Sequence, residues 1–272
     1  MLRNLKEIHD YAIGASDGVI GHVKDLYLDD QSWVARYLVV DTGGWLSSKK
    51  VLVSPLAIGE PDWANRKLPV SITKAQVKDC PDFDSKQPVT RQHEIDYSNY
   101  YGYPYYWGST GYWGAAMYPS MMLPYPAVVG TPTAVSEEVQ AAEASRAANA
   151  DPHLRSCDAL TGYHIHASDG DIGHVSGMLI DDETWAVRYL IVDTSNWWVG
   201  HQMLIAPQWI EGVSWENSTV SVNLTRQAVE DAPTYDPATK LEREDEIRLF
   251  EHYGQSGYWA VSEKRDTDIS RI

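Results

Sequence analysis

Two histidines, His22 and His174, could act chemically as a matched pair, because each follows a glycine at the same place in a repeated segment. A metal site or an acid–base pair would need further ligands close by. Only Asp17, Asp169 and Asp25 stand near them, and the second copy has glycine where the first has Asp25. We therefore interpret the histidines as turn or surface residues kept by duplication, and expect neither a metal nor a cofactor.

Paired carboxylates are a second candidate for chemistry. Asp29-Asp30 and Asp181-Asp182 could offer oxygen ligands to a hard cation. A calcium loop needs more ligands at regular offsets, and the segments DDQSW and DDETW supply too few. We expect acidic turns here and no metal ion.

Two arginines lie inside apolar runs, where a charged side chain needs a partner. Arg36 precedes Asp41 and Arg188 precedes Asp193 on the same predicted strands. Each arginine could pair with its acidic neighbour and stack on a tryptophan, which favours a structural role over substrate binding. The residues predicted to mark the structure of each copy are Trp33, Arg36, Asp41, Trp185, Arg188 and Asp193.

Nucleophilic catalysis has little support in the chain. Ser16 and Ser168 each precede an aspartate, but no base is held at a matching position. The sequence contains no nucleophile elbow, phosphate-binding loop, dinucleotide fingerprint or Cys-His dyad spacing. We expect a protein that is not an enzyme.

The segment Tyr100–Trp113 (YYGYPYYWGSTGYW) has the most unusual composition of the chain. It fits an aromatic surface that recruits a partner, a self-associating tract, or an arm packed over its own domain. The last interpretation is favoured because part of the segment recurs at Tyr253–Trp259. The candidate interaction residues are Tyr105, Tyr106, Trp107, Tyr112, Trp113, Tyr258 and Trp259.

These residues belong to a segment that the chain carries twice. Residues 16–42 (SDGVIGHVKDLYLDDQSWVARYLVVDT) align without a gap with residues 168–194 (SDGDIGHVSGMLIDDETWAVRYLIVDT), 152 positions later. A long period repeated only twice indicates a duplicated domain rather than a solenoid.

Short strands separated by turn signals must position these residues. Asp17-Gly18 is a hairpin signal, and Gly21 suggests a bulge or a close backbone approach. After the last strand, Thr73 and Gln76 predict a capping box on a short helical turn. The predicted strands are 19–28, 33–41, 50–53 and 68–72, which favours a small antiparallel barrel or sandwich.

Each copy is expected to continue into a C-terminal arm. Glu94 matches Glu246, and after a short length difference Gly111–Trp113 matches Gly257–Trp259. Leu241–Tyr253 predicts a short acidic helix. The predicted domains are repeat 1 with its aromatic arm (1–114), a Pro-rich then Ala/Glu-rich linker (115–150), repeat 2 with its arm (151–260) and a C-terminal tail (261–272). Residues 135–150 of the linker are expected to be a partly helical spacer.

The composition narrows the class of protein. A net charge of −16 makes binding to nucleic acid unfavourable. There is no apolar signal segment and no stretch of membrane-spanning length. Cys80 and Cys157 stand alone, as expected of reduced, packed thiols, although the sequence leaves one bridge between them open. We expect a cytoplasmic location.

The repeated motifs resemble the PRC-barrel family. The family pattern is present as Gly21-His22-Val23, the acidic turn, Trp33–Thr42, Trp45-Leu46 and Lys50–Pro55; the second copy shows Trp185–Thr194, Trp197-Trp198 and Met203–Pro207. The resemblance implies a mainly β protein of two small antiparallel PRC-type barrels in tandem, each with a short helical arm.

The family is known from the cytoplasmic domain of the photosynthetic reaction-centre H subunit and from a ribosome-maturation protein. The resemblance implies a non-enzymatic module for protein interaction or assembly with an unidentified protein partner. An alternative is a peripheral component or assembly factor of a photosynthetic complex, which would bring peripheral membrane association. A role in RNA maturation conflicts with the negative charge. Because tandem duplication often preserves an ancestral dimer, we also expect an intramolecular pseudo-dimer of the two barrels.

Overall fold

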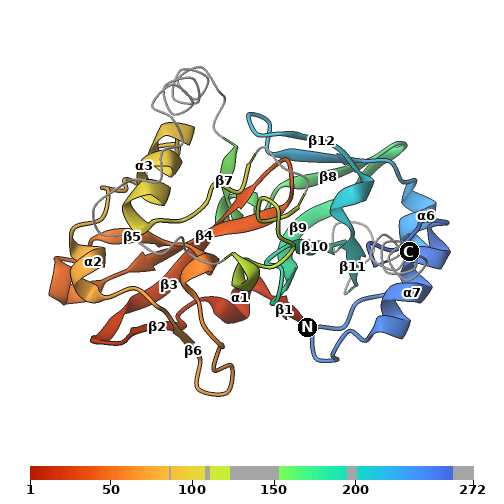
Figure 1. The fold of residues 1–272 in the computed structure, drawn as a ribbon. Coiled ribbons are helices and arrows are strands. Elements are labelled where there is room, and N and C mark those ends of the chain that lie inside the picture. Colours follow the sequence, from red (N-terminus) through yellow and green to blue (C-terminus); the bar gives the residue numbers. More distant parts are fainter. Residues whose placement is uncertain (86, 108–110, 123–152, 195–200, 260–272) are drawn as a thin grey trace, which may run out of the picture. The chain divides into compact units, whose positions relative to one another are not determined.

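The computed structural model describes residues 1–272 except 86, 108–110, 123–152, 195–200 and 260–272 (Figure 1). The predicted spacer 135–150, the tail 261–272 and Trp197-Trp198 lie outside the described residues. The contacts divide the chain into two compact units. Unit 1 comprises Met1, residues 3–160 and residues 179–188, and unit 2 comprises Leu2 with residues 161–178 and 189–272.

Unit 1 is built on a sheet whose strands follow the order β5-β4-β3-β2-β6. The strand β4 (Val34–Asp41) lies between β5 and β3 and is buried from Val34 to Val40, which explains its mostly apolar sequence. The other elements of this part of the chain are β1 (Leu2–Asn4), α1 (Leu5–Ile8), β2 (Ala12–Ala15), β3 (Gly18–Asp29), η1 (Gly43–Leu46), β5 (Lys50–Val53), η2 (Pro55–Ala57), β6 (Lys67–Pro69), α2 (Lys74–Lys78), α3 (Arg91–Tyr101), η3 (Pro119–Met121), β7 (Leu154–Ser156) and α5 (Cys157–Leu160).

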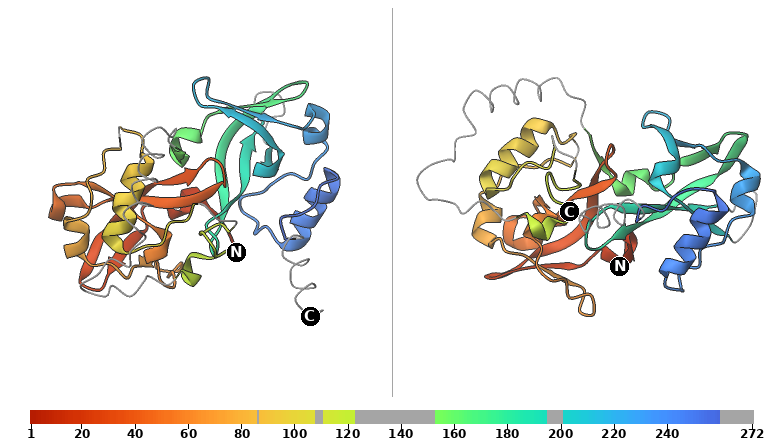
Figure 2. Two further views of the ribbon diagram at one scale, coloured as in Figure 1. Left: turned by 45° about the horizontal axis from the view of Figure 1, so that its top comes forward. Right: turned by 45° about the vertical axis from the view of Figure 1, so that its right-hand side comes forward.

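The helix α3 lies against the strands β4 and β5 (Figures 1 and 2). The side chains between them form an aromatic core. The ring of Tyr97 on α3 meets Tyr37 on β4 edge to face, with centroids 5.1 Å apart. The Tyr97 hydroxyl also accepts the main-chain N–H of Ser54 at 3.0 Å. This buried core contains Tyr27, Tyr37, Val39, Leu52, Val89, Tyr97 and Leu154.

Unit 2 has a sheet with the strand order β11-β10-β9-β8-β13-β12. Its helix α7 packs on this sheet by aromatic contacts, among them Phe250 against Tyr189 of β10 at 6.4 Å between ring centroids. The elements are β8 (His164–Ala167), β9 (Gly170–Asp181), β10 (Val187–Asp193), β11 (Gln202–Ile205), η4 (Pro207–Trp209), β12 (Ile210–Ser214), β13 (Thr219–Val222), α6 (Arg226–Glu230) and α7 (Arg243–His252). The ends of β9 and β10, with the turn between them, belong to unit 1.

The repeat seen in the sequence returns in the bounds of the elements. Strands β3 and β9, β2 and β8, β5 and β11, and helices α2 and α6 each begin and end 152 residues apart. The predicted capping box is confirmed, because Thr73 and Gln76 bond each other's main-chain N–H groups at the start of α2. Equivalent sequence therefore adopts equivalent local structure along most of both copies.

The predicted class, mainly β, is confirmed, but closed antiparallel barrels are not. Each described sheet is an open path of strands. The pairs β2–β6 and β13–β8 are parallel, so the fully antiparallel prediction is wrong there. Parallel pairing is feasible because β6 is far from β2 along the chain, which leaves room for a crossover connection.

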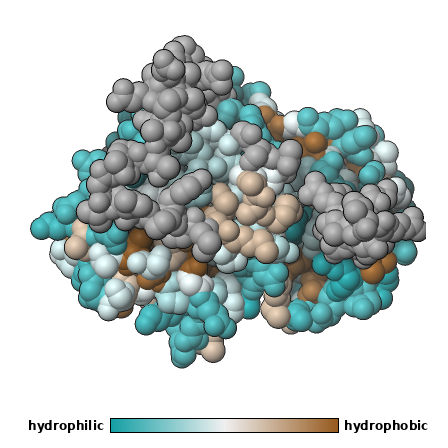
Figure 3. All heavy atoms as spheres, viewed as in Figure 1, coloured by the Kyte–Doolittle hydropathy of each residue, from teal (hydrophilic) through white to brown (hydrophobic). Residues whose placement is uncertain are grey.

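Hydrophilic residues prevail on the face of the molecule shown in Figure 3, and the apolar residues in view form small separate groups. Both cysteines are buried, as predicted for packed thiols. Among the described residues, no helix is long and apolar enough to span a lipid bilayer.

Candidate interaction site

The turn between β3 and β4 is closed by an aspartate. The carboxylate of Asp29 accepts the main-chain N–H groups of Gln31 at 2.9 Å and Ser32 at 3.1 Å. The main-chain N–H of Trp33 then donates to the Asp29 carbonyl at 2.8 Å. An aspartate that caps its own turn in this way fixes the path of the next residues. We call residues 29–36 the first hairpin tip.

The turn between β9 and β10 repeats this construction, and we call residues 181–188 the second hairpin tip. Asp181 accepts from the main-chain N–H of Glu183 at 3.0 Å, and the N–H of Trp185 donates to the Asp181 carbonyl at 2.7 Å. Trp33 and Trp185 both adopt left-handed backbone, with φ of 54° and 60°. This conformation costs a bulky L-residue roughly 1–2 kcal/mol, so surrounding contacts must hold both turns.

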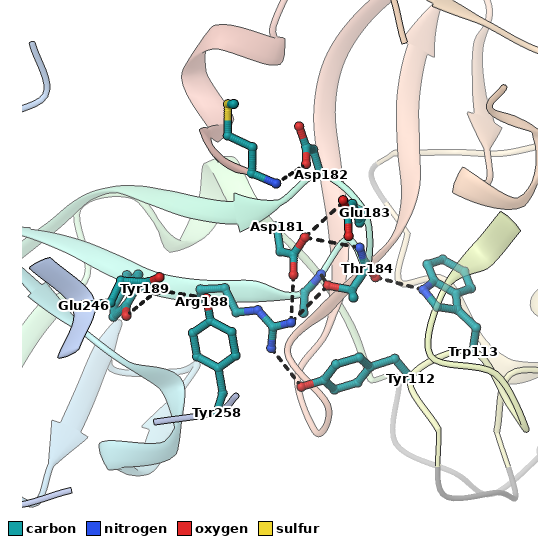
Figure 4. A network of polar contacts seen from close by, with 12 residues as sticks. Tyr112, Trp113, Asp181, Asp182, Glu183, Thr184, Arg188, Tyr189, Glu246 and Tyr258 are labelled. Atoms are coloured by element: carbon teal, nitrogen blue, oxygen red, sulfur yellow. Dashed lines mark hydrogen bonds and ion pairs between the residues drawn. The ribbon is translucent and has the colours of Figure 1, made fainter. Parts of the chain in front are cut away.

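An arginine seven residues after the aspartate supplies one of these contacts. Arg188 donates to the Asp181 carboxylate at 2.8 Å and to the Thr184 hydroxyl at 3.2 Å (Figure 4). Arg36 donates to the Ser32 hydroxyl at 2.9 Å and lies 3.5 Å from Asp29. Burial alone would raise the pKa of Asp181, but the hydrogen bond and charge of Arg188 outweigh it, and the pKa lies below its usual value.

The prediction that Arg36 pairs with Asp41 is wrong. Asp41 instead accepts the main-chain N–H of Gly43 at 2.8 Å. Residues 36 and 41 are an odd number of positions apart on one strand and so face opposite sides of the sheet. Asp29 is paired with Val34 across the hairpin, which places it diagonally next to Arg36 on the same face.

The arm that follows α3 covers Arg36. The guanidinium carbon of Arg36 lies 3.8 Å from the ring centre of Tyr106 and 5.0 Å from that of Trp113. All three side chains are buried. A cation held over desolvated aromatic rings gains attraction from their faces, so the arm and the first tip stabilise each other.

One residue of the arm contacts the arginines of both tips. The main-chain carbonyl of Tyr112 accepts a hydrogen bond from Arg36. Its phenol oxygen accepts one from Arg188 at 3.0 Å (Figure 4). All three residues belong to unit 1. Tyr112 therefore links the two tips through one side chain and one peptide group.

The next residue of the arm fixes the second tip. The indole N–H of Trp113 donates to the Thr184 carbonyl at 2.9 Å, and Trp113 is 1% exposed. Trp185 is also buried, at 3%. It lines a hollow of about 280 Å³ together with Tyr118 and Pro119, which follow along the arm. Tyr112 and Trp113 thus bond the second tip, and Tyr118 and Pro119 line the hollow beside it; we call these four residues the clasp.

The main chains of the two tips also exchange hydrogen bonds within unit 1. The N–H of Ala35 donates to the Trp185 carbonyl at 2.8 Å. In the matching position, the N–H of Val187 donates to the Trp33 carbonyl at 2.7 Å. The two bonds are equivalent under the repeat, so this contact has the reciprocity of a two-fold interface.

A buried glutamate anchors the arm in unit 1, and sequence reasoning missed it. Glu94 is 2% exposed, accepts the Tyr106 hydroxyl at 2.5 Å and lies 3.0 Å from Arg91. Burial raises the pKa of Glu94 to about 7, although Arg91 and the hydrogen bond from Tyr106 oppose the change. The signal for this role was the Arg-x-x-Glu spacing on a helix, followed by a tyrosine.

Unit 2 contains the equivalent group on α7. Glu246 accepts the hydroxyl groups of Tyr189 and Tyr258, each at 2.8 Å (Figure 4), and pairs with Arg243 at 2.9 Å. Because Tyr258 is 152 residues after Tyr106, these contacts correct the predicted alignment of the arms.

The two arms align at the same offset of 152 residues as the rest of the repeat, without the length difference that the sequence had suggested. Arg91 stacks over Trp107 at 4.3 Å, and Arg243 stacks over Trp259 at 4.4 Å. Tyr106-Trp107 is therefore the counterpart of Tyr258-Trp259, and the clasp that begins at Tyr112 has no counterpart at that register.

The predicted interaction residues differ in accessibility. Tyr106 and Trp113 are buried and so face no solvent. Tyr105 and Trp107 stack with centroids 4.6 Å apart. The half-buried members of the set are Tyr105, Trp107, Tyr112, Tyr258 and Trp259.

The predicted metal candidates are not brought together. Asp17 and Asp169 cap helices instead, accepting the main-chain N–H groups of Lys74 at 2.9 Å and Arg226 at 2.7 Å. Asp25 accepts the Ser156 hydroxyl at 2.6 Å. In the part of the chain that the structure describes, no group of three His, Cys, Asp or Glu residues is placed to hold a metal ion.

Comparison with known proteins agrees with the predicted family for part of the chain. A protein of Deinococcus radiodurans, named only as uncharacterized, is 40% identical over 76 residues. The match covers 28% of this chain and 27% of that protein, so the chain spans about a quarter of its relative's length. Residues 8–76 match the model of the PRC-barrel domain. The segment that contains the first hairpin tip is therefore a PRC-barrel domain.

Proposed function

We propose that this protein is a non-enzymatic interaction or assembly module that binds other proteins through the hairpin tips of its repeats. One observation carries the proposal: within unit 1, the second hairpin tip is bound by the kinds of contact that proteins make with a peptide ligand. The second tip is bound by exchanged main-chain hydrogen bonds and by the clasp.

The contacts at the second tip are those by which proteins recognise peptides. Main-chain pairing of Ala35 with Trp185 supplies affinity that is independent of sequence. The buried indole of Trp113 and the Arg188–Tyr112 bond supply selectivity, since aromatic and arginine anchors dominate binding energies at interfaces. Asp29 and Arg36 at the first tip, and Asp181 and Arg188 at the second, are engaged in holding these turns.

We further propose that the chain arose by tandem duplication of a PRC-barrel domain and preserves an ancestral two-fold contact. Three observations support this: the ungapped repeat, the matching element bounds and the reciprocal hydrogen bonds of Ala35 and Val187.

Affinity purification of the tagged full-length chain from native lysate tests the proposed function. We expect a specific partner to be enriched over a tag-only control and to be lost on competition with untagged protein. Pigment-bearing membrane complexes among the enriched proteins would assign the module to photosynthetic assembly. No enrichment, combined with turnover of a substrate in an unbiased activity screen, would contradict the proposal.

A further inference from the structure

The two hairpin tips share one turn geometry but differ in what covers them. At the second tip, the Thr184 carbonyl accepts the Trp113 indole N–H, and Trp185 is 3% exposed. At the first tip, the residues in the same positions are Ser32 and Trp33. The hollow beside Trp185 is lined by Pro55, Ile58 and Pro61 as well as by the clasp, so the clasp is one of the contacts that distinguish the two tips.

The first tip lacks a clasp among the described residues. No described side chain or N–H group donates to the Ser32 carbonyl, and Trp33 is half-buried. Trp33 also stacks on no other described aromatic ring. In the sequence, residues 260–272, which follow the Tyr258-Trp259 pair, contain no Trp, Tyr or Pro.

The clasp itself shows which chemistry fits such a tip. It supplies a tryptophan N–H for the carbonyl before the left-handed Trp, and a Tyr-Pro pair beside the indole of that Trp. Because Trp113 is already bonded to Thr184 and buried, the chain's own clasp is occupied. The same holds for the clasp of a second copy, so neither copy of the clasp is available to cover the first tip.

We propose that the first hairpin tip, centred on the Ser32 carbonyl and Trp33, is a docking site for a partner protein segment that presents an exposed tryptophan followed closely by Tyr-Pro. The inference rests on the proposed function and specifies its partner. The tryptophan N–H of the partner bonds the Ser32 carbonyl, and the Tyr-Pro pair covers the indole of Trp33.

A synthetic peptide of the clasp, residues 111–120 (GYWGAAMYPS), is the probe. Titration into the full-length protein by fluorescence anisotropy gives its affinity, and amide chemical shifts locate the site. We expect shifts at Gln31–Val34. We also expect at least tenfold weaker binding when alanine replaces the tryptophan of the peptide, since that substitution removes both the donor and an aromatic anchor.

Trp33→Gly is the matching change in the protein. Glycine adopts the left-handed backbone of this position without strain, so the turn persists while the indole is lost. We expect at least tenfold weaker peptide binding and an unchanged amide spectrum away from the tip. Val19→Ser, at an exposed apolar residue elsewhere on β3, should leave binding unchanged.

Peptide binding that survives Trp33→Gly, shifts confined to the second tip, or no binding at all would each overturn the docking site. The proposed function fails separately, because it is judged by partner capture with the full-length chain. Capture of a partner that Trp33→Gly does not weaken would leave the module intact and refute its placement at this tip.

Discussion

The indole N–H of Trp113 donates to the main-chain carbonyl of Thr184 at 2.9 Å, across 71 positions of the chain. This bond joins the arm after α3 to a turn that belongs to the other repeat. Because Trp113 is 1% exposed, water does not reach the bond to compete for it. The bond thus joins the clasp to the second tip directly.

Replacing Trp113 by phenylalanine should destabilise unit 1 by about 1–3 kcal/mol, because the buried Thr184 carbonyl loses its donor. Trp107→Phe is the control: Trp107 is half-buried, and no bond of its N–H is among the described contacts. Urea denaturation followed by circular dichroism measures both variants. Equal stability losses would show that the hydrogen bond contributes little.

The two left-handed tryptophans should differ in their contribution to stability. Trp185→Ala removes a buried side chain and should cost roughly 3–5 kcal/mol. Trp33→Ala removes a half-buried one, so we expect roughly half that cost. Both variants keep the same backbone penalty, because both positions have positive φ. Thermal unfolding checks the order, and an equal or reversed order would contradict the burial of the two sites.

Glycine is required at position 21, as its place in the strand suggested. A Cβ atom there would lie 2.0 Å from the Asp41 carbonyl oxygen. Gly21→Ala should therefore destabilise the domain by roughly 1–3 kcal/mol or more, because main chain and not a flexible side chain must move. Gly44→Ala, where nothing lies within 4 Å, is the matched control. A melting temperature for Gly21→Ala equal to that of the control would show that the strand adapts without cost.

The stability of unit 1 should fall as the pH rises through neutrality. The pKa of Glu94 is about 7 in the folded protein, above its ordinary value of 4.5, because burial outweighs the opposing effects of Arg91, Tyr106 and Arg36, while Asp29 raises it further. The folded state therefore binds the proton of the Glu94 carboxyl group more tightly than the unfolded state does. The resulting stability is fully present below about pH 4.5 and is lost as the pH rises through about 7.

Glu94→Gln should remove this dependence, whereas Glu7→Gln, at an exposed carboxylate, should retain it. Urea denaturation at about pH 5 and about pH 8 gives the difference for each protein. Between these two pH values, the free energy of unfolding of the wild type should fall by at most roughly 3 kcal/mol more than that of Glu94→Gln. The assignment to Glu94 would be abandoned if its glutamine variant lost as much stability between the two pH values as the wild type.

Local patterns in the sequence predicted local structure well. Asp17-Gly18 does join two antiparallel strands, and the spacing of Thr73 and Gln76 does form a capping box. Both predictions depend on groups a few residues apart, whose geometry the backbone sets. The PRC-barrel resemblance is confirmed for residues 8–76.

Contacts between distant residues were harder to predict. The partner of Arg36 is set by the register of β3 against β4, which places Asp29 and not Asp41 on its face. A Tyr-Trp pair occurs twice in the first arm, at 106–107 and at 112–113. The sequence favoured the second pair as the counterpart of Tyr258-Trp259, and this alignment was wrong. The contacts of Tyr106 and Tyr258 with their glutamates, and the stacking of Arg91 and Arg243 on the following tryptophans, separated the alternatives.

Unit 1 is discontinuous in the chain, since it includes residues 179–188 as well as residues 3–160. During vectorial synthesis the ribosome releases the clasp long before the turn that it encloses. The indole N–H of Trp113 must therefore wait for Thr184 to emerge, and the phenol oxygen of Tyr112 must wait for Arg188. A nascent chain stalled before this point would leave the Trp113 indole without its partner, so the first repeat completes its folding only after residues 179–188 of the second have emerged.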